Sequence, residues 1–141
     1  MSGLAFFDTN VVVYADDAAS PAKREKAIAL FSEHLRQGTA VVSLQVLQEY
    51  FAAATRKLGL PADRAQRKVE IMARARVVRF DAGDMIAAIE LHRLTQISFW
   101  DALIVQAARC VGATVLYSED LGAGTVLGGV RVVNPFGAAP I

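Results

Sequence analysis

The chain has 141 residues, 54% of them hydrophobic, and a formal net charge of +1 at pH 7. This length suits a single domain over residues 1–141 with a sizeable core, and the balanced charge excludes a large uniform field that would attract nucleic acid or a membrane. A lone cysteine excludes an internal disulfide framework, and neither a bilayer span nor a secretory signal is visible, so we expect a cytoplasmic protein without a membrane partner.

Short apolar runs alternate with helical patterns along the chain. In chain order, the pattern predicts a strand at 4–7, helices at 9–16 and 21–37, a strand at 39–42, helices at 44–58 and 62–75, a strand at 76–80, helices at 81–95 and 99–111, and strands at 113–117 and 130–133. Either Thr9 or Asn10 can cap the first helix. Serine followed by proline at 20–21 is a strong helix start, and Gly38 ends that helix.

The predicted strands are continuously apolar rather than alternating. Strands of this kind are typical of a parallel sheet covered by helices on both faces. We therefore expect an α/β fold with a short parallel sheet of four to five strands, and a small helical hairpin around Pro61. Sites in such folds form at the carboxyl ends of the strands, near the point where the strand order reverses.

Four acidic side chains fall at suggestive points of this pattern, and three of the stretches place the acid in or directly beside a strongly apolar run. Asp8 directly follows the first strand, and Glu49 lies on the helix after the second. Asp101 lies in the first turn of the apolar helix in "SFWDALIVQAA", and Asp120, with Glu119 beside it, lies three residues beyond the fourth strand. At the carboxyl edge of a parallel sheet these acids could converge.

Each acid also has a purely structural interpretation. Asp8 could cap the helix that follows it, and Asp101 could complete a capping box with Ser98. Glu49 could be a solvated or ion-paired helix residue, and the two acids after the fourth strand could be ordinary turn residues. The functional prediction therefore depends on the four acids in combination.

Four carboxylates brought together repel one another unless a cation neutralises them. The cation that suits oxygen ligands is Mg²⁺ or Mn²⁺, and the two histidines, His34 and His92, lack the spacing of a zinc site. A divalent ion held by carboxylates suits phosphodiester hydrolysis, because it activates water and offsets charge in the transition state.

At these residues the chain resembles the PIN-domain ribonucleases, and within them the VapC-type toxins of toxin–antitoxin pairs. The resemblance rests on "FFDTNVVVYA", on Glu49, on "ISFWDALIVQAA" and on "VLYSEDL", in that order. It implies a three-layer, Rossmann-like fold and a Mg²⁺- or Mn²⁺-dependent endoribonuclease. It also implies a homodimer, an RNA substrate and inhibition by a cognate antitoxin protein.

The resemblance also implies roles for single residues. By position, Asp8, Glu49 and Asp101 match the three central catalytic and metal-binding acids of the family, Asp120 matches the fourth, and Glu119 can share its role. The positions that brace these carboxylates are Thr9, Asn10 and Ser118.

Basic residues cluster at the start of the second helix and along the helical hairpin. The hairpin cluster is the predicted contact surface for RNA or antitoxin, because a basic rim places phosphates beside an acidic pocket. Its members are Arg56, Lys57, Arg64, Arg67 and Lys68, and those at the second helix are Lys23, Arg24 and Lys26.

Two other classes of protein stay open. The first is a catalytically silent, PIN-like module that binds RNA or serves as a scaffold. The second is a phosphoryl-transfer domain of the receiver or haloacid-dehalogenase type, which also has an aspartate after the first strand. It fits less well, because position 10 is asparagine where the phosphatases need a second aspartate.

Overall fold

The structure, a computed structural model, describes residues 3–137. The chain order of its elements is β1 (Ala5–Phe7), α1 (Thr9–Tyr14), α2 (Pro21–Gln37), β2 (Ala40–Ser43), α3 (Leu44–Arg56), α4 (Ala62–Met72), β3 (Arg76–Val78), α5 (Ala82–Thr95), α6 (Phe99–Cys110), β4 (Val115–Tyr117), β5 (Val126–Leu127) and β6 (Val130–Val133). The predicted alternation of strands and helices is confirmed over the described residues.

The sheet has six strands in the order β3-β2-β1-β4-β6-β5, and every neighbouring pair is parallel except β5 and β6. The expected parallel sheet is confirmed, with five parallel strands, and the structure adds a sixth, antiparallel strand that the sequence did not predict. The additional strand, β5, has two residues and folds back onto β6 through Gly128 and Gly129, whose φ angles are 58° and 86°. Val126 is largely exposed, so no buried apolar run marks this strand in the sequence.

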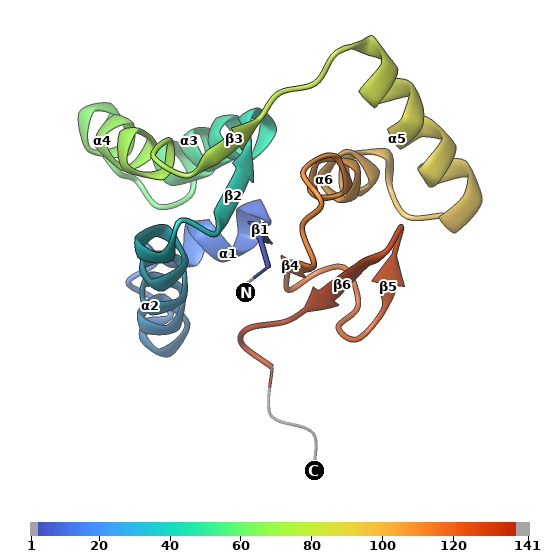
Figure 1. Cartoon of the computed structure of the whole chain (residues 1–141). Coiled ribbons are helices and arrows are strands. Elements are labelled where there is room, and N and C mark those ends of the chain that lie inside the picture. Colours follow the sequence, from blue (N-terminus) through green and yellow to red (C-terminus); the bar gives the residue numbers. More distant parts are fainter. Residues whose placement is uncertain (1–2, 138–141) are drawn as a thin grey trace.

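The helices form a layer on each face of the sheet, as predicted (Figure 1). The chain passes from β1 to β2 and on to β3 in one direction, then returns to β4 on the other side of β1. Because parallel crossovers are right-handed, α1 to α4 cover one face, and α5 and α6 cover the other. The hairpin of α3 and α4 around Pro61 is also present.

The core lies where the central strands meet the helices. All residues of β1 and β2 are buried, and so are six of the twelve residues of α6. Fully enclosed Phe6, Val41 and Leu116 belong to three adjacent strands, and burying each such side chain contributes about 1.5–3 kcal/mol. The site described below therefore stands on a rigid support.

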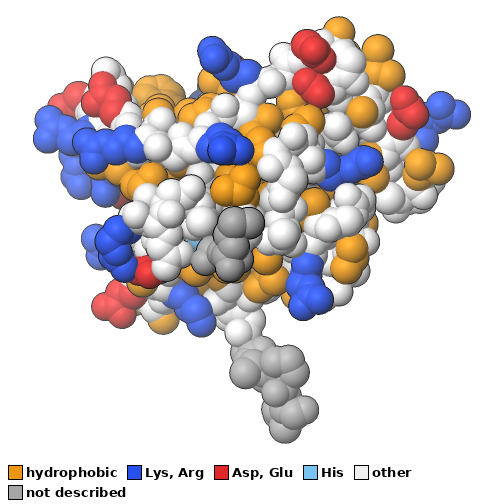
Figure 2. Space-filling view, in the orientation of Figure 1, with side chains coloured by type: hydrophobic (Ala, Val, Ile, Leu, Met, Phe, Trp, Pro, Cys, Tyr) orange, Lys and Arg blue, Asp and Glu red, His pale blue; other side chains and the backbone are white. Residues whose placement is uncertain are grey.

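Basic side chains are unevenly distributed over the surface. Lys and Arg side chains gather on the side of the molecule formed by α4 and α2 (Figure 2).

Among the residues that the structure describes, no helix combines the length and the apolar character that crossing a membrane requires.

The strand order reverses between β1 and β4. These two strands are neighbours, yet the chain leaves β1 toward one edge of the sheet and reaches β4 from the other face. The backbone N–H of Asp8 donates to the carbonyl oxygen of Tyr117 at 3.0 Å. The segments that follow β1 and β4 consequently lie side by side, where ligand sites form in α/β sheets.

Candidate active site

Asp8 is a buried carboxylate at the end of β1, with 6% of its surface exposed. It is the N-cap of α1, one of the three residues for which the sequence left this role open, and its Oδ1 accepts the N–H of Thr9 at 2.7 Å. Its Oδ2 accepts the hydroxyl of Ser118 at 2.8 Å. Burial, aided by the charges of Asp101 and Glu49, raises the pKa of Asp8 from 3.8 to about 6 against these hydrogen bonds.

Asn10 and Ser118 connect the two strand ends. The Nδ2 of Asn10 donates to Asp120 Oδ2 at 3.0 Å, and its Oδ1 accepts the backbone N–H of Glu119 at 3.1 Å. Ser118, which is 1% exposed, accepts the N–H of Asp120 at 3.2 Å while it donates to Asp8. One amide and one hydroxyl thus fix Asp8 and Asp120 relative to each other.

Glu49 approaches from α3, whose start is capped by the Ser43 hydroxyl. Its Oε1 accepts the hydroxyl of Thr9 at 2.5 Å, and its Oε2 accepts the Nε2 of Gln45 at 3.1 Å. Gln45 was not identified from the sequence, although its position four residues before Glu49 on one helix is a usable signal. Both oxygens of Glu49 are therefore oriented by neighbours.

Asp101 lies in the first turn of α6 and is half-buried. Its backbone N–H donates to the Ser98 hydroxyl at 3.0 Å, which is one half of the capping box that the sequence allowed. Burial raises the pKa of its carboxyl, and the charges of Asp120 and Glu49 raise it further. Asp101 therefore lies near enough to Asp120 and Glu49 for their charges to act on it, and all three line the same pocket.

All four predicted acids line one pocket of about 540 Å³ at the carboxyl edge of the sheet. The acidic members of its lining are Asp8, Asp17, Glu49, Asp101, Glu119 and Asp120, and the one basic member is Lys57. The structure thus brings together side chains that are separated by more than a hundred residues along the chain. An excess of negative charge in one concave site favours a cation.

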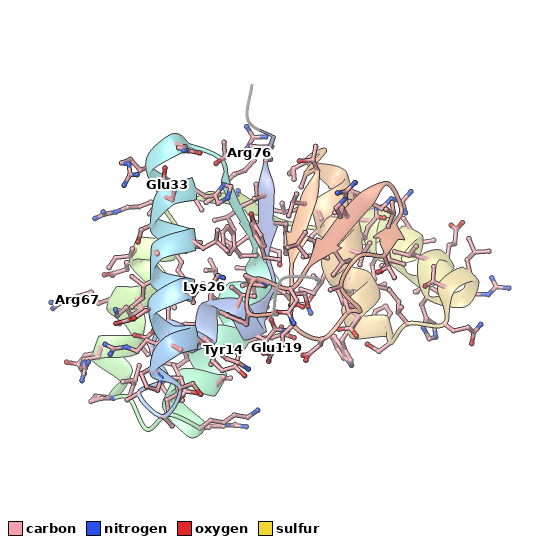
Figure 3. The ribbon with its side chains drawn as sticks, turned by 90° about the horizontal axis from the view of Figure 1, so that it is seen from below. Tyr14, Lys26, Glu33, Arg67, Arg76 and Glu119 are labelled. Atoms are coloured by element: carbon pink, nitrogen blue, oxygen red, sulfur yellow. The ribbon has the colours of Figure 1, made fainter. Side chains whose placement is uncertain are left out.

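Glu119 differs from the other acids in its bonding partners, and Figure 3 shows it close to Tyr14. Its Oε1 accepts the hydroxyl of Tyr14 at 2.9 Å, and its Oε2 lies 2.5 Å from the Nζ of Lys23. The hydrogen bond from Lys23 lowers the pKa of Glu119. This Lys23–Glu119 pair joins α2 to the loop after β4, and no spacing in the sequence signals it.

The acid pocket offers a divalent ion several carboxylate oxygens. Within residues 3–137, no three His, Cys, Asp or Glu side chains are grouped tightly enough to form a ready-made metal cage. Mg²⁺ does not need such a cage, since it keeps several waters and takes one or two carboxylates together with substrate phosphates. The all-oxygen donor set and the raised pKa values of Asp8 and Asp101 fit an ion of this kind.

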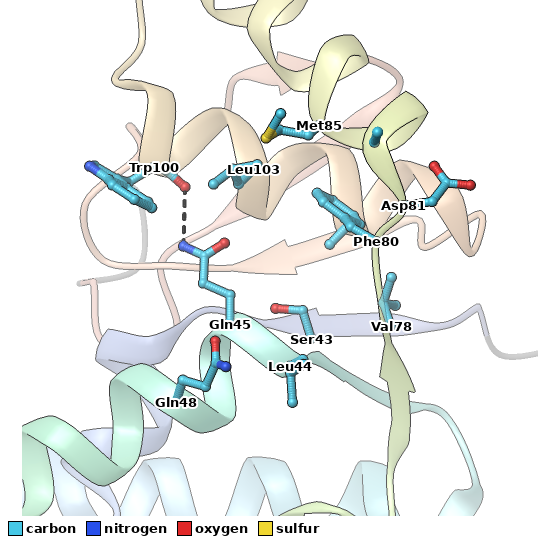
Figure 4. A pocket seen from close by; sticks show the side chains of 12 residues that line it. Ser43, Leu44, Gln45, Gln48, Val78, Phe80, Asp81, Met85, Trp100 and Leu103 are labelled. Atoms are coloured by element: carbon cyan, nitrogen blue, oxygen red, sulfur yellow. Dashed lines mark hydrogen bonds between the residues drawn. The ribbon is translucent and has the colours of Figure 1, made fainter.

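A second pocket of about 550 Å³ lies beyond Gln45, between the start of α3 and the helices α5 and α6 (Figure 4). Its lining is mostly apolar and includes Leu44, Met85 and Trp100, the last of which is 63% exposed. The Nε2 of Gln45 contacts the carbonyl oxygen of Trp100 at 3.5 Å. Gln45 therefore separates an acidic pocket from an apolar one.

Comparison with known proteins agrees with this geometry. The sequence profile of the PIN domain matches residues 5–123, whereas no curated protein matches the chain. Among solved structures, the chain is similar to a toxin–antitoxin complex from Klebsiella pneumoniae, with a TM-score of 0.69, 17% identity and coverage of 94% of this chain and 98% of the other.

Two further structures are similar over most of their length. One is VapC20 of Mycobacterium tuberculosis, a toxin that cleaves the sarcin-ricin loop, with a TM-score of 0.67, 25% identity and coverage of 82% and 89%. The other is VapBC2 from Rickettsia felis, bound to a DNA fragment from its promoter, with a TM-score of 0.65, 18% identity and coverage of 92% and 96%.

Proposed function

The chain belongs to the PIN domain family, and from that premise we propose that it is a divalent-metal-dependent endoribonuclease. We propose further that one PIN domain occupies residues 1–141, of which 1–2 and 138–141 lie outside the described residues, and that the protein is the toxin of a VapBC-type pair. Its substrate is RNA, and its reaction is the hydrolysis of a phosphodiester bond.

The observation that carries this proposal is the convergence of four acids on one pocket at the strand-order reversal. Asp8 and Asp101 have raised pKa values, which is the expected response of carboxylates to burial beside one another. Strongly perturbed acids in a concave site are candidates for a functional role.

The residues proposed to hold Mg²⁺ or Mn²⁺ are Asp8, Glu49, Asp101 and Asp120. When bound, a divalent ion supplies a more acidic water as nucleophile and offsets negative charge on the phosphate in the transition state. We assign the fourth role to Asp120 rather than Glu119, because Glu119 is already engaged by Lys23 and Tyr14.

The supporting residues keep the carboxylates in place and ionisable. Ser118 and Thr9 donate to Asp8, and these hydrogen bonds favour its charged form. Asn10 holds Asp120 against the loop after β4, and the Thr9 hydroxyl orients Glu49. Preorganised oxygens of this kind reduce the rearrangement that binding an ion and a phosphate would require.

The proposed partners are a cognate antitoxin and a second copy of the chain. The similar toxin–antitoxin complexes support the first. Exposed apolar side chains on α3, α5 and α6 around the apolar pocket, among them Leu44, Met85, Ile86 and Trp100, support a homodimer. The proposed location is the cytoplasm.

The test is an RNA cleavage assay on the purified protein, with the metal removed by EDTA and then restored as Mg²⁺ or Mn²⁺. Cleavage should disappear on chelation, return with metal and be lost in Asp101→Asn, while Asp63→Asn, an exposed aspartate in the first turn of α4, should cleave normally. Activity that is indifferent to EDTA would contradict the proposal.

The competing function is a catalytically silent RNA-binding or scaffold module. The absence of a ready-made metal cage among residues 3–137 is the observation that favours it. In the same assay this alternative predicts RNA binding without cleavage in any metal.

A further inference from the structure

A third pocket, of about 440 Å³, adjoins the acid pocket. The two pockets share Asp17, Lys57 and Leu58 in their linings. The rest of this pocket comes from the loop between α1 and α2, the start of α2, the loop after α3 and the start of α4. A polymer bound in one pocket can therefore continue directly into the other.

Three cationic side chains line this third pocket, each from a different segment. Arg24 comes from α2, Lys57 follows α3 and Arg64 lies on α4. Within the described part of the chain, none of the three makes a salt bridge or a side-chain hydrogen bond. Their positive charge is therefore available to a ligand.

The two acidic residues that line the third pocket, Asp16 and Asp17, already have hydrogen-bond or ion-pair partners. Asp16 accepts the hydroxyl of fully buried Tyr50 at 2.5 Å and lies 3.3 Å from the Nζ of Lys68. Asp17 accepts the backbone N–H of Ala19 at 3.0 Å. The contacts of Asp16 also join the loop after α1 to α3 and α4, the hairpin that carries Lys57 and Arg64.

We propose that Arg24, Lys57 and Arg64 form a subsite for a backbone phosphate of single-stranded RNA, next to the phosphate that lies in the acid pocket. This inference rests on the proposed function, since it assigns a path to the same substrate. Lys57 lines both pockets and marks the point where the strand passes from one to the other.

The lining favours a phosphate backbone over an acidic peptide. Cations from three segments around one concavity suit a ligand with regularly spaced negative charge. A docked peptide commonly uses aromatic anchors in fitted apolar pockets, whereas the only large apolar residues in this lining are Leu58 and Leu60. Phosphate contacts position a strand without reading its sequence. The subsite should therefore not discriminate between bases.

The test measures binding without cleavage, in EDTA, by the fluorescence anisotropy of a labelled single-stranded oligoribonucleotide of mixed sequence. Arg24→Gln, Lys57→Gln and Arg64→Gln should each weaken binding roughly three- to tenfold at low salt. Each should also reduce the slope of log affinity against log salt by about 0.7 to 1. DNA of the same sequence should lose affinity to the same degree.

The matched control is Arg93→Gln, an exposed arginine in the last turn of α5, with the same change in charge. Arg93 belongs to the helix layer on the other face of the sheet and does not line the third pocket. The control should bind RNA within twofold of wild type. Equal effects from Arg93→Gln and the three pocket variants would overturn the proposal, and so would losses confined to RNA and absent with DNA.

Polyglutamate serves as the second probe. If the pocket variants lose polyglutamate binding and keep RNA binding, the pocket takes an acidic protein segment and the proposal is wrong. Because metal is absent throughout, failure of the proposed function is seen separately: wild type would bind RNA with the expected pattern and still not cleave it when Mg²⁺ or Mn²⁺ is added.

Discussion

The burial of Asp8 should make the metal-free protein lose stability as the pH rises, and Asp8→Asn should remove that loss. The folded-state pKa of Asp8 is raised from 3.8 to about 6. Between these values the native protein keeps a proton that the unfolded chain has released. The free energy of unfolding therefore falls through this window, and the full penalty is present above pH 6.

The magnitude follows from the size of the shift. A difference of about two pKa units corresponds to about 3 kcal/mol, at 1.36 kcal/mol per unit. Because small domains have only about 5–15 kcal/mol of stability in total, the effect is large enough to measure. Asparagine cannot ionise. Its amide oxygen can still accept the N–H of Thr9, but its amide makes a poorer hydrogen bond with the Ser118 hydroxyl. That loss costs about 1 kcal/mol and is the same at every pH.

The assay is urea unfolding of wild type and Asp8→Asn in EDTA at several pH values between about 4 and about 7. The difference in unfolding free energy should shift by about 3 kcal/mol in favour of the variant across this range. The exposed Asp63→Asn is the matched control and should leave the pH dependence unchanged. Adding Mg²⁺ at neutral pH should then stabilise wild type more than Asp8→Asn, because binding to the native state alone adds stability.

A difference between wild type and Asp8→Asn that stays constant from pH 4 to pH 7 would refute this reasoning. It would mean that the carboxylate is solvated well enough to keep an ordinary pKa. The burial argument for a cation in the acid pocket would then lose its main support.

Three other outcomes are expected. Asp101→Asn should reduce RNA cleavage by on the order of 10²-fold or more. Its thermal midpoint should stay unchanged, because the helix cap uses the backbone N–H of residue 101 and not its carboxylate. Loss of the folded state would instead indicate a structural role. Tyr50→Phe should lower the free energy of unfolding by about 1.5–3 kcal/mol, since Asp16 loses a buried donor, and a change below about 0.5 kcal/mol in urea unfolding would contradict this. Expression of the chain alone should arrest growth and co-expression of a small partner from an adjacent gene should relieve it, whereas harmless expression would favour the silent module.

The sequence by itself determined the fold class and singled out four acids that the structure places in one pocket. Continuous apolar strands between helical patterns have few solutions other than a parallel sheet with helices on both faces, and most of the acids stand out because they lie in or beside apolar runs. The caps at Ser43 and Ser98 are local hydrogen bonds, so they could be predicted from a few residues. The short edge strand β5 could not, because exposed Val126 and half-buried Leu127 are too short a run to show a strand pattern.

Only the tertiary structure decided how the acids differ from one another. Burial and neighbouring charge raise the pKa of Asp8, while Lys23 lowers that of Glu119, although both residues follow apolar strands in the sequence. Lys23 and Glu119 are 96 residues apart along the chain, and the contact exists because α2 packs beside β4, with the ring of His34 next to that of Tyr117. Tertiary packing also places Arg24, Lys57 and Arg64 around the third pocket. Electrostatic effects depend on the distances between groups and on their burial. The amino-acid sequence alone shows neither of these quantities.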